Sequence, residues 1–365
     1  MVDTTSGGFR SVHIYDFNRA DPHAWLPWAD LSDPVGEHPW IPRDAEYIGR
    51  TLLALADILG PSRAANLRVL VAWFWGVEPK LPYTGDDVIV FCLGDELGRK
   101  PNYSHDVNLV AKTGGWTRRP FVALGPIRSW GHVPAAVLQE LRAQLLRLPS
   151  AVASMVRTIR HRRRPHFIEI PLAPWSFPTG RAAPLDARRY DLSFAGSMIN
   201  EGRRRWVLPQ KTRSRRKLIA ALEEIARERP DVRVEIRLFD SFHDAKLVEG
   251  YEELMMQTRL APCPRGGFRE TYRLFEAAAS GCVPITEPLP QRRYYEGCPA
   301  VQLGSWSLLP AAAFRLLADP EQLRNRQQAA LEWWSKRCSP KATAMLVAEG
   351  IGETGRAGAY HDRGQ

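Results

Sequence analysis

Uninterrupted apolar runs of strand length recur along this chain, and amphipathic helical segments separate them. The runs LRVLVAWF (67–74) and DVIVFCL (87–93) are examples. Runs of this kind are typical of parallel strands whose two faces are both covered by helices. The segment DAEYIGRTLLALADILG (44–60) has an acidic first turn and a terminal glycine, which are the signals of such a helix. The pattern therefore predicts an α/β protein with parallel sheets.

The strand–helix pattern occurs twice, with a segment rich in proline, glycine and tryptophan between the two halves. A chain of 365 residues also exceeds the length at which a single hydrophobic core stops growing. We therefore expect two α/β domains with a cleft between them, where the carboxyl ends of strands face each other. The predicted division is a first domain over 1–172, a second over 173–338, a hinge at about 170–180, a helix over 339–351 that returns to the first domain, and a flexible tail over 352–365.

The segment CPRGGFRETYRLFEAAASGCVPI (263–285) carries the clearest functional signal. Gly266 and Gly267 allow a ligand to approach the backbone closely, and they precede a helix predicted over 270–280. The amino end of a helix offers unpaired N–H groups and the positive end of the helix dipole. At helical spacing, one polar stripe is expected to face away from the core, either to solvent or into the cleft. It is made of Arg269, Tyr272, Arg273, Glu276 and Ser280.

Two ligand groups suit this stripe. Arg265, Arg269 and Arg273 offer charge-assisted hydrogen bonds to phosphate oxygens, and Glu276 can accept hydrogen bonds from two vicinal hydroxyls, as on a ribose. These features together predict a pyrophosphate site. The alternative is an ordinary amphipathic surface helix with arginine–glutamate pairs.

The same segment resembles the donor-binding signature of exostosin-like glycosyltransferases and the related ribitol xylosyltransferases. The matching residues are Cys263-Pro264-Arg265-Gly266, Glu270, Tyr272-Arg273, Glu276-Ala277 and Gly281-Cys282-Val283-Pro284. DLSFAGS (191–197) resembles the first strand and loop of the donor domain, and VHIYD (12–16) resembles the opening of exostosin domains.

The resemblance implies the GT-B architecture, in which two Rossmann-like domains place their parallel sheets across a cleft. It implies an acceptor site in the N-terminal domain and a nucleotide-sugar site in the C-terminal domain. Arg273 would contact the diphosphate, and Glu276 the ribose. The other residues implied at the donor site are Ser197, Arg265, Gly266, Glu270, Thr271 and Tyr272. Glu270 and Glu276 are six positions apart, whereas many GT-B enzymes have glutamates eight apart, so a donor-sugar contact for Glu270 stays open.

The sequence has no D-x-D triad, no Walker A loop and no G-x-G-x-x-G motif, and none of its five cysteines forms a C-x-x-C pair. We therefore expect a transferase that needs neither a metal ion nor a cofactor. Arginines and a helix amino end would then stabilise the leaving diphosphate. Unpaired, scattered cysteines also favour a reducing compartment.

A transferase that inverts configuration needs a general base for the acceptor hydroxyl. Asp95 and Glu96 follow the strand that ends near 93, so they are the leading candidates. Asp16, His105 and His132 rank behind them. Asp95 or Glu96 can equally well cap the following turn, and a retaining reaction needs no such base.

The net charge of +10 favours an anionic partner. We expect a nucleotide-sugar donor, with UDP favoured by the resemblance, and a glycan, glycolipid or glycoprotein acceptor. Two alternatives are a nucleic-acid-binding protein and a nucleotide-sugar-binding protein without activity. Three basic runs, HRRR (161–164), RRR (203–205) and KTRSRRK (211–217), are interpreted in the first place as solvated faces. They lie in different elements, which argues against nucleic acid. Without a secretion signal or an apolar membrane span, the expected location is the cytoplasm, including the inner face of an anionic membrane.

Overall fold

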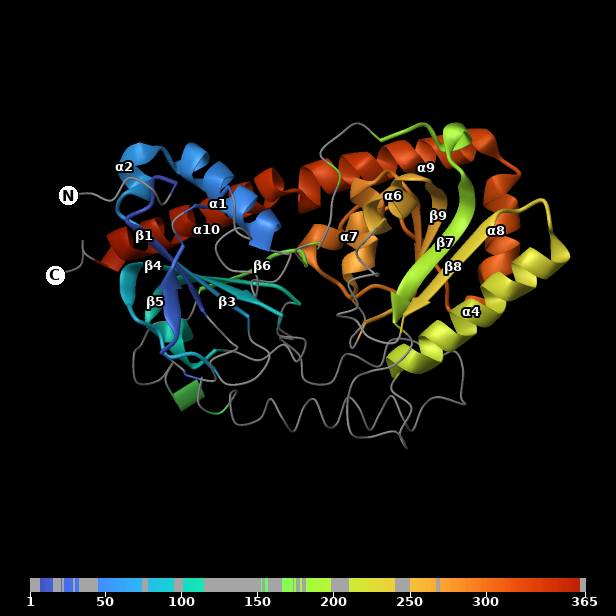
Figure 1. The fold of residues 1–365 in the computed structure, drawn as a ribbon. Coiled ribbons are helices and arrows are strands. Elements are labelled where there is room, and N and C mark those ends of the chain that lie inside the picture. The colour runs from blue at the N-terminus through green and yellow to red at the C-terminus, as the bar shows by residue number, and fades with distance from the viewer. Residues whose placement is uncertain are drawn as a thin grey trace. The chain divides into compact units, whose positions relative to one another are not determined.

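A computed structural model provides the coordinates of the chain (Figure 1). The structure describes residues 7–15, 21, 23–28, 30–32, 45–73, 78–94, 101–114, 152, 155–156, 166–172, 174, 178, 182–197, 210–239, 250–266 and 270–361. Within this part of the chain, no helix combines the length and the apolar character needed to cross a bilayer.

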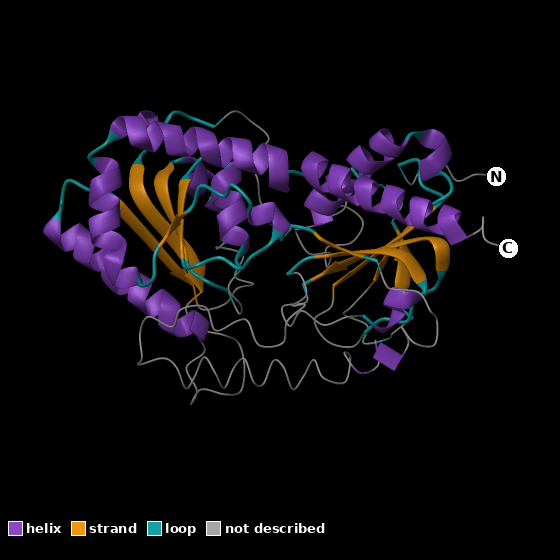
Figure 2. Cartoon of the chain, turned by 180° about the vertical axis from the view of Figure 1, so that it is seen from behind, coloured by secondary structure: helices purple, strands orange, loops and turns teal. Residues whose placement is uncertain are grey.

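The chain divides into two compact units, and each is built on its own sheet (Figure 2). Unit 1 comprises Met1–Ala173 together with Pro340–Gln365, and unit 2 comprises Pro174–Ser339. The last helix, α10 (Pro340–His361), therefore belongs to unit 1. It continues to His361, into the segment 352–365 for which the sequence predicted a flexible tail.

Unit 1 contains a six-stranded sheet in the order β2-β1-β3-β4-β5-β6. All neighbouring strands are parallel except β2, a short antiparallel edge strand that the sequence pattern did not predict. The bounds are β1 Ser11–Tyr15, β2 Trp25–Pro27, β3 Arg68–Trp73, β4 Gly85–Leu93, β5 Val107–Lys112 and β6 Phe167–Glu169. The central strands β3, β4 and β5 are buried almost throughout, as their uninterrupted apolar sequences predict.

Two long helices of unit 1, α1 (Ala45–Leu59) and α10, pack against each other, while α2 (Pro61–Ala64) follows α1 directly. The hydroxyls of Tyr47 on α1 and Thr343 on α10 form a buried hydrogen bond of 2.6 Å. At Gly350 of α10, a Cβ atom would lie 3.1 Å from Ile168 of β6. The absence of a side chain there lets α10 lie close to the sheet.

Unit 2 contains a five-stranded, wholly parallel sheet in the order β11-β10-β9-β7-β8. Its strands are β7 Tyr190–Ser197, β8 Val234–Phe239, β9 Thr258–Cys263, β10 Val283–Thr286 and β11 Val301–Gln302. The helices are α4 Gln210–Glu228, α6 Tyr251–Met256, α7 Tyr272–Ala279, α8 Leu309–Leu317 and α9 Pro320–Trp333, and a π-helix, Trp334–Cys338, continues α9. The prediction of an α/β protein with two parallel sheets is confirmed.

The strand order of unit 2 reverses at β7. From β7 the chain moves to β8 on one side and then crosses to β9 on the other. β7 pairs with β9 only near its start, at Tyr190–Thr258 and Leu192–Leu260, whereas its pairing with β8 continues to Ser197–Phe239. The carboxyl ends of β7 and β9 thus flank a topological switch point, where open α/β sheets bind their ligands.

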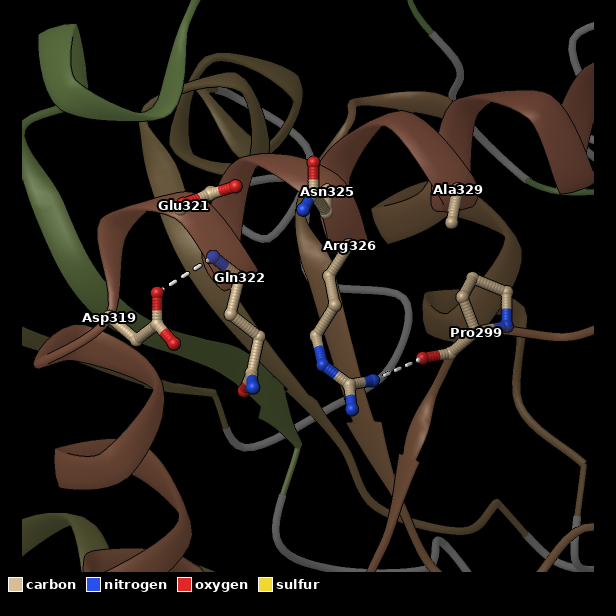
Figure 3. Close-up of a pocket in the computed structure, with 7 residues that line it drawn as sticks. All are labelled: Pro299, Asp319, Glu321, Gln322, Asn325, Arg326 and Ala329. Atoms are coloured by element: carbon tan, nitrogen blue, oxygen red, sulfur yellow. Dashed lines mark hydrogen bonds between the residues drawn. The ribbon is translucent and has the colours of Figure 1, made fainter.

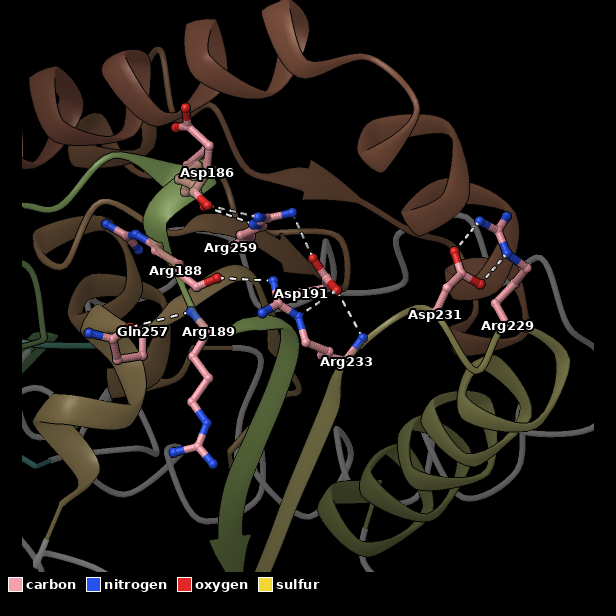
Figure 4. Close-up of polar contacts among 10 residues, drawn as sticks. Asp186, Arg188, Arg189, Asp191, Arg229, Asp231, Arg233, Gln257 and Arg259 are labelled. Carbon is pink, nitrogen blue, oxygen red and sulfur yellow. Dashed lines mark hydrogen bonds and ion pairs between the residues drawn. The ribbon is translucent and has the colours of Figure 1, made fainter.

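Arginines, one of them fully buried, stabilise the opposite, amino-terminal side of β7 (Figure 4). Arg188 is 1% exposed, and its guanidinium donates hydrogen bonds to the carbonyl oxygens of Ala183, Thr258 and Ser280 at 2.6–3.2 Å. Asp191 accepts hydrogen bonds from the guanidinium of Arg259 at 2.9 Å and from the backbone N–H of Arg233 at 2.8 Å. Each of these charged groups therefore has partners within the fold.

Candidate functional site

Two buried arginines converge on the carboxyl end of β7. Arg215 comes from α4, the helix that follows β7, and Arg273 comes from α7, the helix that follows β9. A Cβ atom on Gly196 would lie 3.3 Å from Nη2 of Arg273 and 3.5 Å from Nη1 of Arg215. The two side chains, called here the guanidinium pair, thus lie beside the backbone of β7 at the switch point.

The guanidinium pair has donors without partners. Arg215 is 7% exposed and Arg273 is 9% exposed, and within the described part of the chain neither forms an ion pair. Arg215 donates from Nη1 to the carbonyl oxygen of Ser197. Nε of Arg215, Nη1 of Arg273 and Oγ of Ser197 are buried without a hydrogen-bond partner among the described residues. Buried polar groups are normally hydrogen-bonded, so these three atoms point to a ligand that accepts hydrogen bonds.

The charges of the pair favour an anion. Burial, and then the positive charge of Arg273, lower the pKa of Arg215 to about 10, so Arg215 is still a cation at neutral pH. The Cζ atoms of Arg273 and Arg215 lie 4.6 Å and 5.9 Å from the centroid of the Phe194 ring, whose face attracts cations. The ring offsets only part of the cost of burying two like charges, since a cation–π contact contributes roughly 0.5–2 kcal/mol. A bound anion would relieve their repulsion.

A carboxylate lies one turn further along α7. Glu276 is 5% exposed, and its Oε2 accepts a hydrogen bond of 2.7 Å from the hydroxyl of Tyr251, the first residue of α6. Burial, and the nearby Glu276 carboxylate, hold the pKa of Tyr251 well above its ordinary value, so the phenol remains protonated and donates. The ring of Tyr251 also lies 5.4 Å from Cζ of Arg273. An anion-binding group and a hydrogen-bond acceptor are therefore adjacent on one helix.

The described residues of the polar stripe on α7 are buried or half-buried, so of the two expected orientations the stripe does not have the one toward solvent. The helix begins at Tyr272 and ends at Ala279, within the predicted range 270–280. Arg273, Glu276 and Ser280 are all buried, and Tyr272 is half-buried. The interpretation of α7 as an ordinary surface helix is therefore wrong. Arg269 and Gly267 lie outside the described residues.

Glu270 precedes α7 and has a different environment. Its Oε1 accepts hydrogen bonds from the hydroxyls of Tyr294 at 2.5 Å and Tyr295 at 3.0 Å. The rings of both tyrosines lie against Phe275, and Tyr295 stacks on Trp333. The carboxylate thus ties the start of α7 to an aromatic cluster. This arrangement gives Glu270 a structural role and leaves its predicted contact with a donor sugar without support.

The other predicted donor-site residues lie around the same switch point. Ser197 ends β7, and Arg265 and Gly266 lie in the turn after β9, one residue beyond its end. A Cβ atom on Gly266 would lie 3.0 Å from the carbonyl oxygen of Glu270, so this turn favours glycine. Thr271 occupies the position before α7, but its side chain makes no capping hydrogen bond. The structure therefore brings Ser197, Arg273 and Glu276 together, with Arg265 and Gly266 in the adjoining turn.

The candidate general bases all belong to unit 1, and the structure describes one of them. Asp95, Glu96, Asp16 and His132 lie outside the described residues. His105 lies in a 3₁₀ helix, Asn102–His105, that leads into the amino end of β5. Asp106 follows His105, and its carbonyl oxygen accepts a hydrogen bond from the backbone N–H of Gly85, where β4 starts. His105 is therefore at the edge opposite the carboxyl ends of these strands, which corrects its ranking as a candidate base.

Sequence reasoning missed two residues of the site, Arg215 and Tyr251. Arg215 belongs to the run KTRSRRK (211–217), for which a solvated face was the favoured interpretation. A signal was present, because Leu218 and Leu222 follow Arg215 at three and seven positions and are buried. An arginine on the apolar stripe of a helix needs a buried partner or ligand. Tyr251 has no comparable local signal.

A separate surface hollow of about 460 Å³ lies along α9 (Figure 3). Two of its polar residues have structural contacts, since Asp319 caps α9 by accepting from the N–H of Gln322, and Arg326 donates to the carbonyl of Pro299. Among the described residues, no group of three or more histidine, cysteine, aspartate or glutamate side chains is arranged to hold a metal ion. All five cysteines are free thiols.

Comparison with known proteins gives only distant structural similarity. No family model and no curated protein matches the sequence. Among solved structures, the chain is similar to TarM (11% identity, 82% of this chain and 57% of TarM, TM-score 0.43). It is also similar to the pneumococcal O-GlcNAc transferase GtfA in complex with UDP and GlcNAc (10%, 85% and 60%, 0.42) and to Anabaena Alr3699/HepE in complex with UDP (15%, 83% and 96%, 0.37). The chain thus spans less than two thirds of the length of TarM and GtfA.

Proposed function

We propose that this protein is a glycosyltransferase of the GT-B, exostosin-like type that takes its sugar from a nucleoside diphosphate sugar. The observation that carries the proposal is the guanidinium pair, Arg215 and Arg273, with unpartnered buried donors at a switch point. Glu276 beside it offers an acceptor for ribose hydroxyls. The resemblance of the segment 263–285 to donor-binding signatures supports the same assignment.

In the proposed complex, Nε of Arg215, Nη1 of Arg273 and Oγ of Ser197 donate hydrogen bonds to diphosphate oxygens. When the bond between sugar and diphosphate breaks, negative charge develops on the departing phosphate. Two guanidiniums in a buried site stabilise that charge strongly, because they are already oriented and little water screens them. The proposal therefore includes no metal ion. UDP is the favoured leaving group.

Unit 1 would then bind the acceptor, a glycan, glycolipid or glycoprotein, and Asp95 or Glu96 would serve as base if the reaction inverts configuration. The proposed place of action is the cytoplasm or the inner face of an anionic membrane. A second candidate function is binding of a nucleotide sugar without transfer, which the same donor site would also support. Nucleic-acid binding is disfavoured, because Arg215, one of the basic residues of 211–217, is buried rather than presented on the surface.

The first test measures thermal stabilisation by UDP, GDP, CDP and ADP in the presence of EDTA. A ligand at 100 times its dissociation constant stabilises a protein by about 2.7 kcal/mol if it binds only the folded state. We expect one nucleotide to raise the melting temperature of the wild type. The Glu276→Gln variant should bind this nucleotide with roughly tenfold lower affinity and show a smaller rise in melting temperature, because it loses a charge-assisted acceptor.

Arg216→Gln is the matched control, since Arg216 is exposed on α4 next to Arg215, and it should respond as the wild type does. The absence of any shift with all four nucleotides would contradict the proposal. A second experiment separates the two candidate functions. It screens nucleotide sugars that carry the nucleotide found to bind, and it measures release of the nucleoside diphosphate. Release that depends on an added acceptor supports transfer, whereas binding without release supports the second candidate.

A further inference from the structure

Tyr251 contacts both parts of the site. Its hydroxyl donates to Oε2 of Glu276 at 2.7 Å, and its ring lies 5.4 Å from Cζ of Arg273. Arg273 and Glu276 are three positions apart on α7, whereas Tyr251 comes from α6, before β9. A single side chain from another element thus spans the phosphate-binding and hydroxyl-binding groups.

Both contacts limit the motion of flexible side chains. Glutamate has three side-chain torsions, and a phenol that donates to one oxygen fixes the direction of the carboxylate. Because burial keeps Tyr251 protonated, this donor persists at neutral and mildly basic pH. The ring face similarly attracts the guanidinium of Arg273. The two contacts belong to one rigid ring, so the positions of Arg273 and Glu276 depend on each other.

We infer that Tyr251 is a positioning residue that couples diphosphate recognition to ribose recognition and so makes the site selective for ribonucleotides over 2′-deoxyribonucleotides. This inference rests on the proposed nucleotide site. A phosphate held by Arg273 steadies the ring of Tyr251, and the hydroxyl of that ring aims the Glu276 carboxylate at the ribose. Coupling between two subsites is reciprocal, so a ribose on Glu276 also strengthens the hold on the diphosphate.

The test compares Tyr251→Phe with the wild type by calorimetry, using UDP, 2′-deoxy-UDP and inorganic pyrophosphate in the presence of EDTA. We expect the wild type to bind UDP about tenfold more tightly than 2′-deoxy-UDP, as for the loss of one hydrogen bond to a charged group. In the Phe variant this ratio should fall close to one. Pyrophosphate should bind within about twofold of the wild type, because the ring and its cation–π contact remain.

Tyr295→Phe is the matched control, because it also removes a buried phenol that donates to a glutamate, Glu270, and it should leave the ratio unchanged. Tyr251→Leu removes the ring as well and should weaken pyrophosphate binding. An unchanged ratio in Tyr251→Phe would overturn the inference, and so would an equal loss of affinity for all three ligands. A wild type that binds UDP and 2′-deoxy-UDP equally overturns the inference alone, whereas one that binds none of the three ligands overturns the proposed function too.

Discussion

Replacement of Arg273 by methionine should weaken UDP binding by at least about 30-fold without lowering the stability of the ligand-free protein. Arg273 contributes a buried donor that has no partner within the described chain, and a lost hydrogen-bonded charge pair typically costs about 2–5 kcal/mol of binding free energy. In the ligand-free protein, the substitution removes one of two buried like charges. Replacing buried charges by apolar side chains of similar volume is often neutral or stabilising by about 1–4 kcal/mol.

The measurement combines calorimetric titration with UDP and thermal unfolding without ligand. Arg215→Met should weaken UDP binding similarly, because Arg215 and Arg273 lie together beside the Phe194 ring, but it also removes the donor to the carbonyl oxygen of Ser197. Arg216→Gln again serves as the exposed control. If Arg273→Met binds UDP within about threefold of the wild type, the guanidinium pair is not the phosphate site.

The same substitution at Arg188 should have the opposite effect on stability. Arg188→Met removes a donor from the buried carbonyl oxygens of Thr258 and Ser280, and it leaves the carbonyl of Ala183 with the amide of Gln327 as its donor. Each buried acceptor left unsatisfied costs about 1–3 kcal/mol, so we expect a loss of roughly 3–5 kcal/mol in the free energy of unfolding. Affinity for UDP, measured where the variant is still folded, should change little.

The measurement is urea denaturation. We follow the unfolding transition whose midpoint UDP raises, because that transition reports the unfolding of unit 2. Arg189→Met is the matched control, because Arg189 is the exposed neighbour of Arg188 and should tolerate the change (Figure 4). A loss below about 1 kcal/mol for Arg188→Met would contradict the structural role assigned to this arginine. The contrast between Arg188 and Arg273 separates an arginine that stabilises the fold from one that binds a ligand.

Several features of this protein could be predicted from the sequence because they depend on local patterns. Apolar runs of strand length predicted the α/β class and the strands of both sheets except the short edge strands β2 and β11. The segment 263–285 predicted a turn and helix carrying Arg273 and Glu276, and both residues do lie at a buried polar site. Helical period and strand length are local properties, so a single sequence suffices to recognise them.

Only the tertiary structure decided which groups the polar faces of these helices contact. Helical period places Arg273, Glu276 and Ser280 on one stripe, but whether that stripe meets solvent or other buried groups depends on α4, α6 and β7, which are distant in sequence. The order β10-β9-β7-β8, which creates the switch point, depends on the direction of the crossover after β8, and no local pattern records it. The same holds for Tyr251 beside Glu276 and for Glu270 against Tyr294. The sequence by itself therefore determined which elements form and which of their residues share a face, whereas the packing of elements determined which charges are buried together and need a ligand.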